Sequence, residues 1–147
     1  MSAAEVGAFL QGHDRLALAT NGPGGFPHVV AMAYGLLGGR IAFWGDRRSV
    51  KMCNLARDPR LGLLIEESGT GDDHGLLRGV HLAGRADLVD DPGRMEEIAD
   101  AILVQRFGTP DRRHLPTDLD VLLRRRVGAL VTVERTASWD HTKAAGG

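Results

Sequence analysis

The sequence predicts a mainly β (α+β) fold, in which an antiparallel barrel of about six strands carries two or three peripheral helices. Short segments of alternating apolar residues are separated by glycine-rich turns, a pattern typical of strands joined by hairpins. Few segments show helical spacing, which disfavours a parallel sheet wrapped by crossover helices. The 147 residues, 43% of them apolar, are enough for one core. Since no repeat or linker is visible, we expect residues 1–147 to form a single domain.

The first predicted elements are a helix, a strand and a longer extended segment. Ala3–Gln11 is predicted to be a helix, because Ser2 and Glu5 have the spacing of a capping box. Arg15–Thr20 is predicted to be a strand, and a cluster of Asn, Gly and Pro residues separates it from an extended segment over Phe26–Leu37. Tight connections in so short a stretch favour an antiparallel meander.

The middle of the chain contains two predicted strands and one helix. A two-residue glycine turn at 38–39 leads into a predicted strand over Arg40–Gly45. Val50–Arg57 is predicted to be a helix that ends before Pro59, since the residue preceding a proline avoids helical geometry. Arg60–Glu66 follows as a strand in which apolar residues alternate.

The last part of the chain contains two further strands and an amphipathic helix. A polar loop over 67–75 precedes a predicted strand over Leu77–Val89, and Val127–Arg135 is predicted to be another strand. An irregular loop is predicted over 108–119, residues 119–126 are ambiguous, and a tail covers 136–147. Asp91 and Pro92 mark the start of a helix whose apolar stripe consists of Met95, Ile98, Ala99, Ile102 and Leu103.

Composition and charge exclude several classes of protein. The 18 Lys+Arg residues nearly balance the 19 Asp+Glu residues, which argues against nucleic-acid binding driven by bulk charge. The longest apolar stretch, Val29–Leu37, is far shorter than the roughly 20 residues of a membrane-spanning helix, and the N-terminus lacks the basic run of a secretory signal. We therefore expect a cytoplasmic protein. Cys53 is a lone cysteine and no histidine pair has metal-ligand spacing, so no metal site is predicted.

The most informative segment runs from Phe43 through Trp44, Gly45 and Asp46 to Lys51, at a predicted strand–helix junction. The first amides of a helix lack intrahelical partners and carry the positive end of the helix dipole. Ser49 supplies a hydroxyl, and positive charges come from Arg47, Arg48 and Lys51. The junction is therefore predicted to bind a phosphate group. The alternative is that Ser49 only caps the helix while the arginines are solvated.

The strand that includes residues 26–33 is the second candidate surface. A flat ring can lie along such a strand while main-chain groups bind its edge, or the apolar residues there can simply fill the barrel core. The candidate contacts are His28, Val29, Val30, Ala31 and Met32.

Two further features stand outside these segments. The run Arg124-Arg125-Arg126 is expected to be a solvated edge, since three charges do not make a nucleic-acid site. Trp139 lies in a polar tail and is predicted to dock, because an exposed Trp forfeits about 1.5–3 kcal/mol of burial. It can dock on a partner subunit, at the edge of a cofactor pocket or on this chain's own core.

Taken in order, these segments resemble the pyridoxamine 5′-phosphate oxidase-like split β-barrel proteins, and more closely their flavin/deazaflavin oxidoreductase branch. The resemblance covers roughly residues 5–141 and is carried by the segments GFPHVVAMAYGL and RIAFWGDRRSVKMCNLARDPRLGLLI with a late Trp. Its most specific part runs from Lys51 to Arg60 and is similar to the family pattern K-x-x-N-L-x-x-D-P-R. Oxidase members carry an Arg immediately before this Lys, whereas this chain has Val50, so Arg47 or Arg48 would supply the missing charge.

The resemblance implies a split β-barrel that forms a homodimer, with FMN or the deazaflavin coenzyme F420 at the interface. Ser49 and Lys51 would hold the phosphate, and the ring would rest against residues 28–32 and the backbone of residues 44–46. The ring would supply the redox chemistry, so no catalytic acid or base is assigned to the protein.

The function expected from this resemblance is an FMN- or F420-dependent oxidoreductase that acts on a small organic substrate. FMN is preferred, while the glutamyl tail of F420 would suit a basic groove formed by Arg47, Arg48 and Arg57. The alternatives are a non-catalytic carrier of the same cofactor, and a haem-binding split barrel. In the haem-binding protein, the iron ligand would come from His28, His81 or His141.

Overall fold

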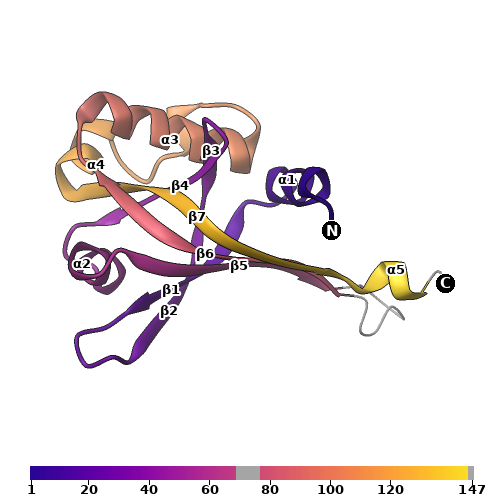
Figure 1. The fold of residues 1–147 in the computed structure, drawn as a ribbon. Helices are drawn as coiled ribbons and strands as arrows, with labels where there is room; N and C mark the ends of the chain where they lie inside the picture. Colours follow the sequence, from indigo (N-terminus) through magenta and orange to yellow (C-terminus); the bar gives the residue numbers. More distant parts are fainter. Residues whose placement is uncertain (69–76, 146–147) are drawn as a thin grey trace.

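The structure is a computed structural model that describes residues 1–68 and 77–145. Within them lie seven strands, five α-helices and one short 3₁₀ helix (Figure 1). In chain order these are α1 (Ala3–Gln11), β1 (Arg15–Asn21), β2 (Pro27–Ala33), β3 (Gly35–Leu37), β4 (Arg40–Asp46), α2 (Val50–Arg57), β5 (Arg60–Ser68), β6 (Leu77–Val89), α3 (Pro92–Phe107), η1 (Arg112–His114), α4 (Leu119–Arg125), β7 (Arg126–Asp140) and α5 (His141–Ala145).

All seven strands belong to one antiparallel sheet in the order β2-β1-β5-β6-β7-β4-β3. The two edge strands, β2 and β3, are consecutive in the chain and are joined through the single residue Tyr34. Because one residue connects the two edges, the sheet has to curl until they approach each other, and it forms a half-barrel. The mainly β, α+β fold class is therefore confirmed.

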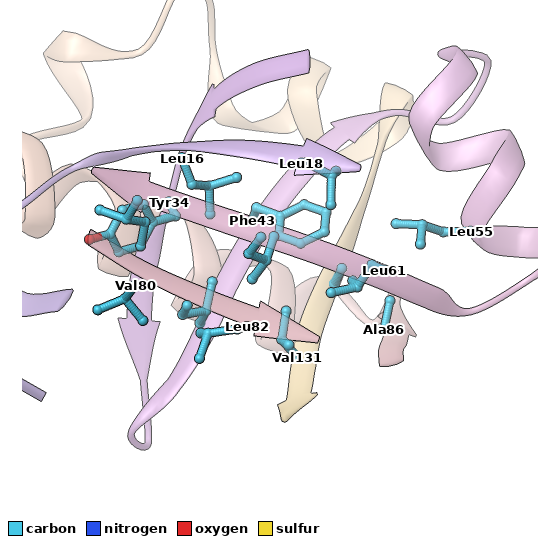
Figure 2. Close-up of a cluster of buried hydrophobic side chains, with 14 of the residues drawn as sticks. Leu16, Leu18, Tyr34, Phe43, Leu55, Leu61, Val80, Leu82, Ala86 and Val131 are labelled. Atoms are coloured by element: carbon cyan, nitrogen blue, oxygen red, sulfur yellow. The ribbon is translucent and has the colours of Figure 1, made fainter. Parts of the chain in front are cut away.

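The inside of the half-barrel is the main hydrophobic core. Along β1, Leu16, Leu18 and Thr20 are buried while the residues between them are partly exposed, the alternation expected of a strand with one buried face. Phe43 of β4 and Tyr34 are fully buried among these side chains (Figure 2). The other buried members include Leu55, Leu61, Leu63, Ile65, Val80, Leu82, Ala86 and Val131.

A second cluster lies outside the sheet, where α3 packs on β3, β4 and β7 (Figure 1). The predicted stripe from Met95 to Leu103 is buried at all five positions, which confirms that prediction. Two glycines permit this close packing, because a side chain at either position would collide with α3. A Cβ at Gly35 would lie 2.4 Å from the carbonyl carbon of Ala101, and a Cβ at Gly128 would lie 2.6 Å from Cδ1 of Ile98. Of the described helices, none is long and apolar enough to cross a membrane.

Several predicted boundaries differ from those observed. The segment 26–37 divides at Tyr34 into β2 and β3, and the ambiguous residues 119–126 form α4 followed by the start of β7. β7 continues to Asp140, beyond the predicted end at Arg135, because β6 offers pairing partners as far as Arg78. The predicted loop 108–119 contains η1, while most of the predicted loop 67–75 lies outside the described residues.

The outer face of the sheet is divided into two halves. α3 and α4 lie over the half formed by β3, β4 and the start of β7. Over the other half, β1, β2, β5 and β6 present a strip of small and apolar outward side chains that are partly or fully exposed, bordered by polar ones such as Arg15, His81 and Arg85. We call this half the bare face; it includes Ala17, Ala19, Val29, Ala31, Gly62, Leu64 and Ala83.

Candidate functional site

A pocket of about 420 Å³ lies where the end of β2 meets the end of β4 and the start of α2. Because the sheet curls, strands from opposite ends of the strand order contribute to one wall. We call it the Lys51 pocket; it is lined by Met32, Ala33, Trp44, Gly45, Asp46, Ser49, Lys51, Leu122, Arg125 and Arg126.

The turn between β4 and α2 is fixed by hydrogen bonds to Asp46. Its main-chain carbonyl accepts from the amide of Ser49 at 3.0 Å and from the Ser49 hydroxyl at 2.7 Å. Its carboxylate accepts from the Arg48 amide at 2.8 Å. Ser49 is the N-cap of α2, but its Oγ lies 3.4 Å from the Met52 amide, a long contact for a cap. The first turn of α2 borders the pocket, and the Ser49 side chain caps its amides only weakly.

Lys51 reaches the pocket by lying across the main chain of Gly45. A Cβ at position 45 would stand 2.8 Å from Cε of Lys51 and 3.3 Å from its Nζ. Glycine at this position therefore lets the half-buried lysine lie close against β4. Burial lowers the pKa of Lys51, the charge of Arg126 lowers it further, and Asp46 acts in the opposite direction.

Arg126 is the second half-buried cation of this pocket. Its guanidinium carbon lies 4.8 Å from the ring centroid of Trp44, a cation–π arrangement that orients the side chain. Burial lowers its pKa too, although a guanidinium remains charged at any ordinary pH. Among the described residues, Asp46 is the only carboxylate that lines the pocket, and it is exposed. Two desolvated positive charges with one solvated negative charge favour the binding of an anion.

A second pocket, of about 470 Å³, adjoins the first and shares Asp46 and Arg125 with it. The amide of Arg47 donates to the carbonyl of Arg125 at 2.9 Å, which ties the β4–α2 turn to the end of α4. We call it the arginine pocket, and its lining residues are Asp46, Arg47, Arg48, Arg124 and Arg125.

The structure brings part of the sequence-predicted set together. Six of those residues line the Lys51 pocket: Met32, Trp44, Gly45, Asp46, Ser49 and Lys51. Arg47 and Arg48 line the arginine pocket instead.

The remaining residues of the predicted set lie elsewhere. On β2, Val29 and Ala31 are exposed on the bare face, while His28 and Val30 face the other side and line neither pocket. The Nδ1 atom of His28 is buried and has no hydrogen-bond partner among the described residues.

Trp139 docks on this chain's own sheet, far from the Lys51 pocket. A Cβ at Gly79 of the neighbouring strand would lie 2.3 Å from the indole ring, so the ring covers that glycine. At about 3.3 Å a residue, the strand between Arg126 and Trp139 spans roughly 40 Å. Within one chain Trp139 therefore cannot contact a molecule in the Lys51 pocket.

Sequence reasoning missed the contribution of the second arginine run. Arg126 is half-buried and lines the Lys51 pocket together with Arg125, so the expectation of a solvated edge is wrong for it. The signal was the triple arginine itself, but its location depends on the pairing of Arg126 with Asp46 across β7 and β4. Arg57, expected in the same basic groove, instead donates to Asn54 and lines neither pocket.

Comparisons with known proteins bear on the whole chain. The sequence model described as pyridoxamine 5′-phosphate oxidase matches residues 2–130, which include every residue of both pockets. No curated protein matches the sequence.

Solved structures extend the likeness to the fold. A conserved hypothetical protein of Mycobacterium tuberculosis, Rv2991, is 35% identical with a TM-score of 0.85, covering 99% of this chain and 88% of that one. A haem-binding protein of Mycobacterium smegmatis is 22% identical with a TM-score of 0.71, over 99% of this chain and 61% of that one. A protein described as an F420 reductase is 21% identical with a TM-score of 0.63, over 88% and 94% of the two chains. The last two likenesses show the fold alone.

Proposed function

The chain belongs to the pyridoxamine 5′-phosphate oxidase family, and from that premise we propose that it is an oxidoreductase that binds FMN through the Lys51 pocket and acts on a small organic substrate. Coenzyme F420 is the alternative cofactor. The observation that carries the proposal is the charge of the pocket, where the half-buried Lys51 and Arg126 share a single exposed carboxylate. A phosphate supplies the negative charge that this pocket lacks.

The residues present fit a phosphate-bearing cofactor. Lys51 and Arg126 would neutralise the phosphate, and the first amides of α2 would donate hydrogen bonds to it. The Ser49 hydroxyl donates to the Asp46 carbonyl in this structure and would turn from it to donate to the phosphate. Gly45 lets Lys51 lie against β4 and bring its ammonium group into the pocket, in which a flat ring would rest beside Met32. The bound ring supplies hydride transfer, while the protein binds and orients it.

Dimerisation through the bare face completes the proposal. This half of the sheet presents small and apolar side chains that no described helix covers, and Trp139 lies on the same face over Gly79. Exposed apolar surface of this kind is typical of interfaces, and a two-fold pair is the commonest oligomer. A second copy is therefore the proposed occupant.

Sedimentation of the purified chain tests the dimer. We expect the wild type to sediment as a dimer and Ala19→Glu, on the bare face, to sediment as a monomer. Val104→Glu places the same charge on an exposed apolar position of α3 and leaves the dimer intact. A monomeric wild type contradicts this part of the proposal.

The two alternative functions predict different observations. A cofactor carrier would bind FMN or F420 in the same pocket without turning over any substrate. A haem-binding protein needs an axial ligand, and of the described histidines none lines the Lys51 pocket. Of the three candidate ligands, His28 faces the other side of β2 and lines neither pocket, His81 is exposed on the bare face and His141 lies beyond the end of β7, so the geometry favours the phosphate-bearing cofactor.

The deciding experiment is the visible absorption spectrum of the purified protein, with mass spectrometry of any compound that copurifies with it. A flavin spectrum supports FMN, a deazaflavin spectrum supports F420, and a Soret band supports haem. Calorimetric titration of the cofactor-free protein with FMN and with F420 then gives the two dissociation constants. A colourless protein that binds neither compound overturns the proposal.

A further inference from the structure

The proposed function uses only Lys51 of the sequence pattern K-x-x-N-L-x-x-D-P-R, which begins at that residue and ends at Arg60. Asn54 and Asp58 of the same pattern line neither the Lys51 pocket nor the arginine pocket. Asn54 is nevertheless only 2% exposed, and so is its hydrogen-bond partner, Thr20 of β1. In the described part of the chain, these two are the only buried polar side chains. Because two apolar side chains of the same shape would fill the space without desolvating polar groups, the pair requires another explanation.

The last turn of α2 is tied to the end of β1, which lies beside it (Figure 1). Nδ2 of Asn54 donates a hydrogen bond to Oγ1 of Thr20 at 3.0 Å. Nδ2 of Asn21, the next residue of β1, donates to the carboxylate of Asp58 at 3.1 Å. Asp58 is the C-cap of α2, and its own amide donates to the main-chain carbonyl of Asn54 at 2.8 Å. Two consecutive residues of one strand thus hold two positions at the end of the helix.

Apolar packing alone would leave the orientation of α2 less well defined. The buried apolar side chains of α2 are Met52 and Leu55. Burial of apolar surface is non-directional, and a methionine side chain adapts to irregular gaps. A buried hydrogen bond is directional, and it weakens when its donor and acceptor move out of line. The bond between Asn54 and Thr20 is therefore the contact that determines how α2 is rotated about its own axis.

The rotation of α2 determines where the ammonium group of Lys51 lies. Lys51 stands three residues before Asn54, and residues at this spacing are neighbours on the surface of a helix. Its side chain lies against β4, where a Cβ at Gly45 would stand 2.8 Å from Cε of Lys51. A charge-assisted hydrogen bond joins N⁺ and O⁻ over about 2.7–2.9 Å. A small rotation of α2 would therefore withdraw Nζ from a bound anion.

We propose that Asn54, through its hydrogen bond to Thr20, is a positioning residue that holds α2 in the rotation that brings the Lys51 ammonium group to the phosphate of the cofactor. Neither Asn54 nor Thr20 lines the Lys51 pocket, and the whole effect passes through Lys51. The inference rests on the proposed function. It applies to FMN and to F420 alike, since both carry a phosphate.

A matched pair of variants at position 20 separates the hydrogen bond from the packing. Thr20→Val keeps the shape of the side chain without its hydroxyl, whereas Thr20→Ser keeps the hydroxyl and loses a methyl group. Both variants and the wild type are titrated calorimetrically with FMN and with F420, and Thr20→Val is also combined with Lys51→Ala. Urea unfolding measures the stability of each protein.

We expect Thr20→Val to weaken the tighter of the two ligands by about fivefold, which is less than the loss caused by Lys51→Ala. Thr20→Ser should change the affinity by less than about twofold, because it still accepts from Asn54. In the Lys51→Ala background, Thr20→Val should cause no further loss, since both changes act through the same ammonium group.

A second variant separates affinity from stability. Thr20→Val leaves the Asn54 amide buried without its acceptor and should lower the urea midpoint. The double variant Thr20→Val/Asn54→Leu replaces both partners by apolar side chains, so its urea midpoint should lie close to that of the wild type while the ligand still binds about fivefold more weakly. Val80→Ala, a truncation at a core position of β6 that is 1% exposed, should lower the midpoint and leave the affinity unchanged.

Two results overturn the positioning role while the proposed function stands. If Thr20→Val and Thr20→Ser bind the ligand equally well, the hydrogen bond does not determine the affinity. If Thr20→Val causes the same loss in the Lys51→Ala background, its effect does not pass through Lys51. A wild type that binds neither FMN nor F420 overturns the proposed function itself, and the positioning role with it.

Discussion

Two groups of charged side chains lie near opposite ends of β7, and they are organised in opposite ways. We call the end of β7 at Asp140 the far end. At the far end, Glu67 accepts hydrogen bonds from His13, at 2.8 Å, and from Arg78. Close by, Lys143 of α5 pairs with Glu5 of α1 at 2.6 Å. The cations Arg78 and Lys143 each have a carboxylate beside them, so the charges at the far end are paired within the chain.

At the other end, the cations of the Lys51 pocket outnumber the carboxylates. Burial lowers the pKa of both Lys51 and Arg126, which shows that desolvation disfavours their charges and that Asp46 does not restore the balance. Charges paired within the chain stabilise the fold, whereas charges left unpaired at a cost to stability indicate a ligand. The following predictions test whether the two ends differ in this way.

The largest expected effect is on cofactor affinity at the pocket end. Lys51→Ala alone should weaken FMN binding by about 1–2 kcal/mol, the scale of a charge-assisted hydrogen bond. The double variant Lys51→Ala/Arg126→Ala should weaken it about a hundredfold. Calorimetric titration measures the affinity, and urea unfolding should show that the free protein is no less stable. An unchanged dissociation constant would remove both residues from the site.

Gly79→Ala tests the far end and should reduce stability instead of affinity. The new methyl group would overlap the ring of Trp139, which a Cβ would approach to 2.3 Å. Overpacking of this kind costs about 1–3 kcal/mol, measurable as a lower urea midpoint. Gly45→Ala is the matched change in the pocket, where the methyl group meets the flexible Lys51 side chain at 2.8 Å. It should lower FMN affinity with little loss of stability. Equal losses of stability in the two variants would contradict the predicted difference between the two ends.

The pH dependence of binding follows from the lowered pKa of Lys51. As the pH rises through that pKa, still below the ordinary value of 10.5, the lysine loses its charge and FMN affinity should fall by up to about tenfold. The unfolded chain keeps this proton to higher pH, so the free protein should gain stability in the same window. Titrations between neutral and alkaline pH measure both effects. In Lys51→Arg the decline in affinity should disappear; a decline of the same size would assign it to another group.

Arg78→Ala should remove one paired charge at the far end. Both Arg78 and Glu67 are more than a third exposed, so we expect a loss of only about 0.5–1 kcal/mol in the free energy of unfolding. FMN affinity should stay the same, because the Lys51 pocket lies at the other end of β7. Reduced affinity with unchanged stability would contradict the division between the ends.

The smallest expected effect is on the stability of the fold at acidic pH. Hydrogen bonds from Lys143 and Ser2 lower the pKa of Glu5 from 4.5 to about 2. The stability contributed by this carboxylate is fully present above pH 4.5 and is lost as the pH falls towards 2. Glu5→Gln should therefore flatten the acid limb of the stability curve and leave its alkaline limb unchanged. An identical acid limb in the variant would show that Glu5 does not contribute to it.

Local sequence patterns were enough to predict most of the fold. The capping box at Ser2, the helix over Val50–Arg57 and the apolar stripe of α3 depend on neighbouring residues, and each is observed as predicted. The division at Tyr34 was missed because it depends on the curling of the whole sheet. The extension of β7 to Asp140 was missed because none of residues 136–140 is buried in the core, and the pairing with β6 keeps them extended.

The sequence predicted the part of the candidate site that lies within one short segment. It did not predict the part that comes from distant segments of the chain. The turn from Trp44 to Lys51 contains its anion-binding features within one short segment, so its sequence indicated them directly. Arg126 joins that turn by pairing with Asp46 across β7 and β4, and Arg125 joins it through the hydrogen bond from the Arg47 amide. No spacing in the sequence encodes either contact. Trp139 was left with three possible docking surfaces, because a tail residue's partner depends on where the preceding strand ends.

The chain's two tryptophans stand at its two contrasting ends: Trp44 lies beneath Arg126 in the Lys51 pocket, and Trp139 lies over Gly79 at the far end of β7. The molecule thus carries a separate intrinsic fluorophore in each region. Trp139→Phe leaves an emission that reports on the pocket alone, while Trp44→Phe leaves one that reports on the opposite end and on whatever contacts the bare face. Quenching in one variant without quenching in the other would separate ligand binding from self-association.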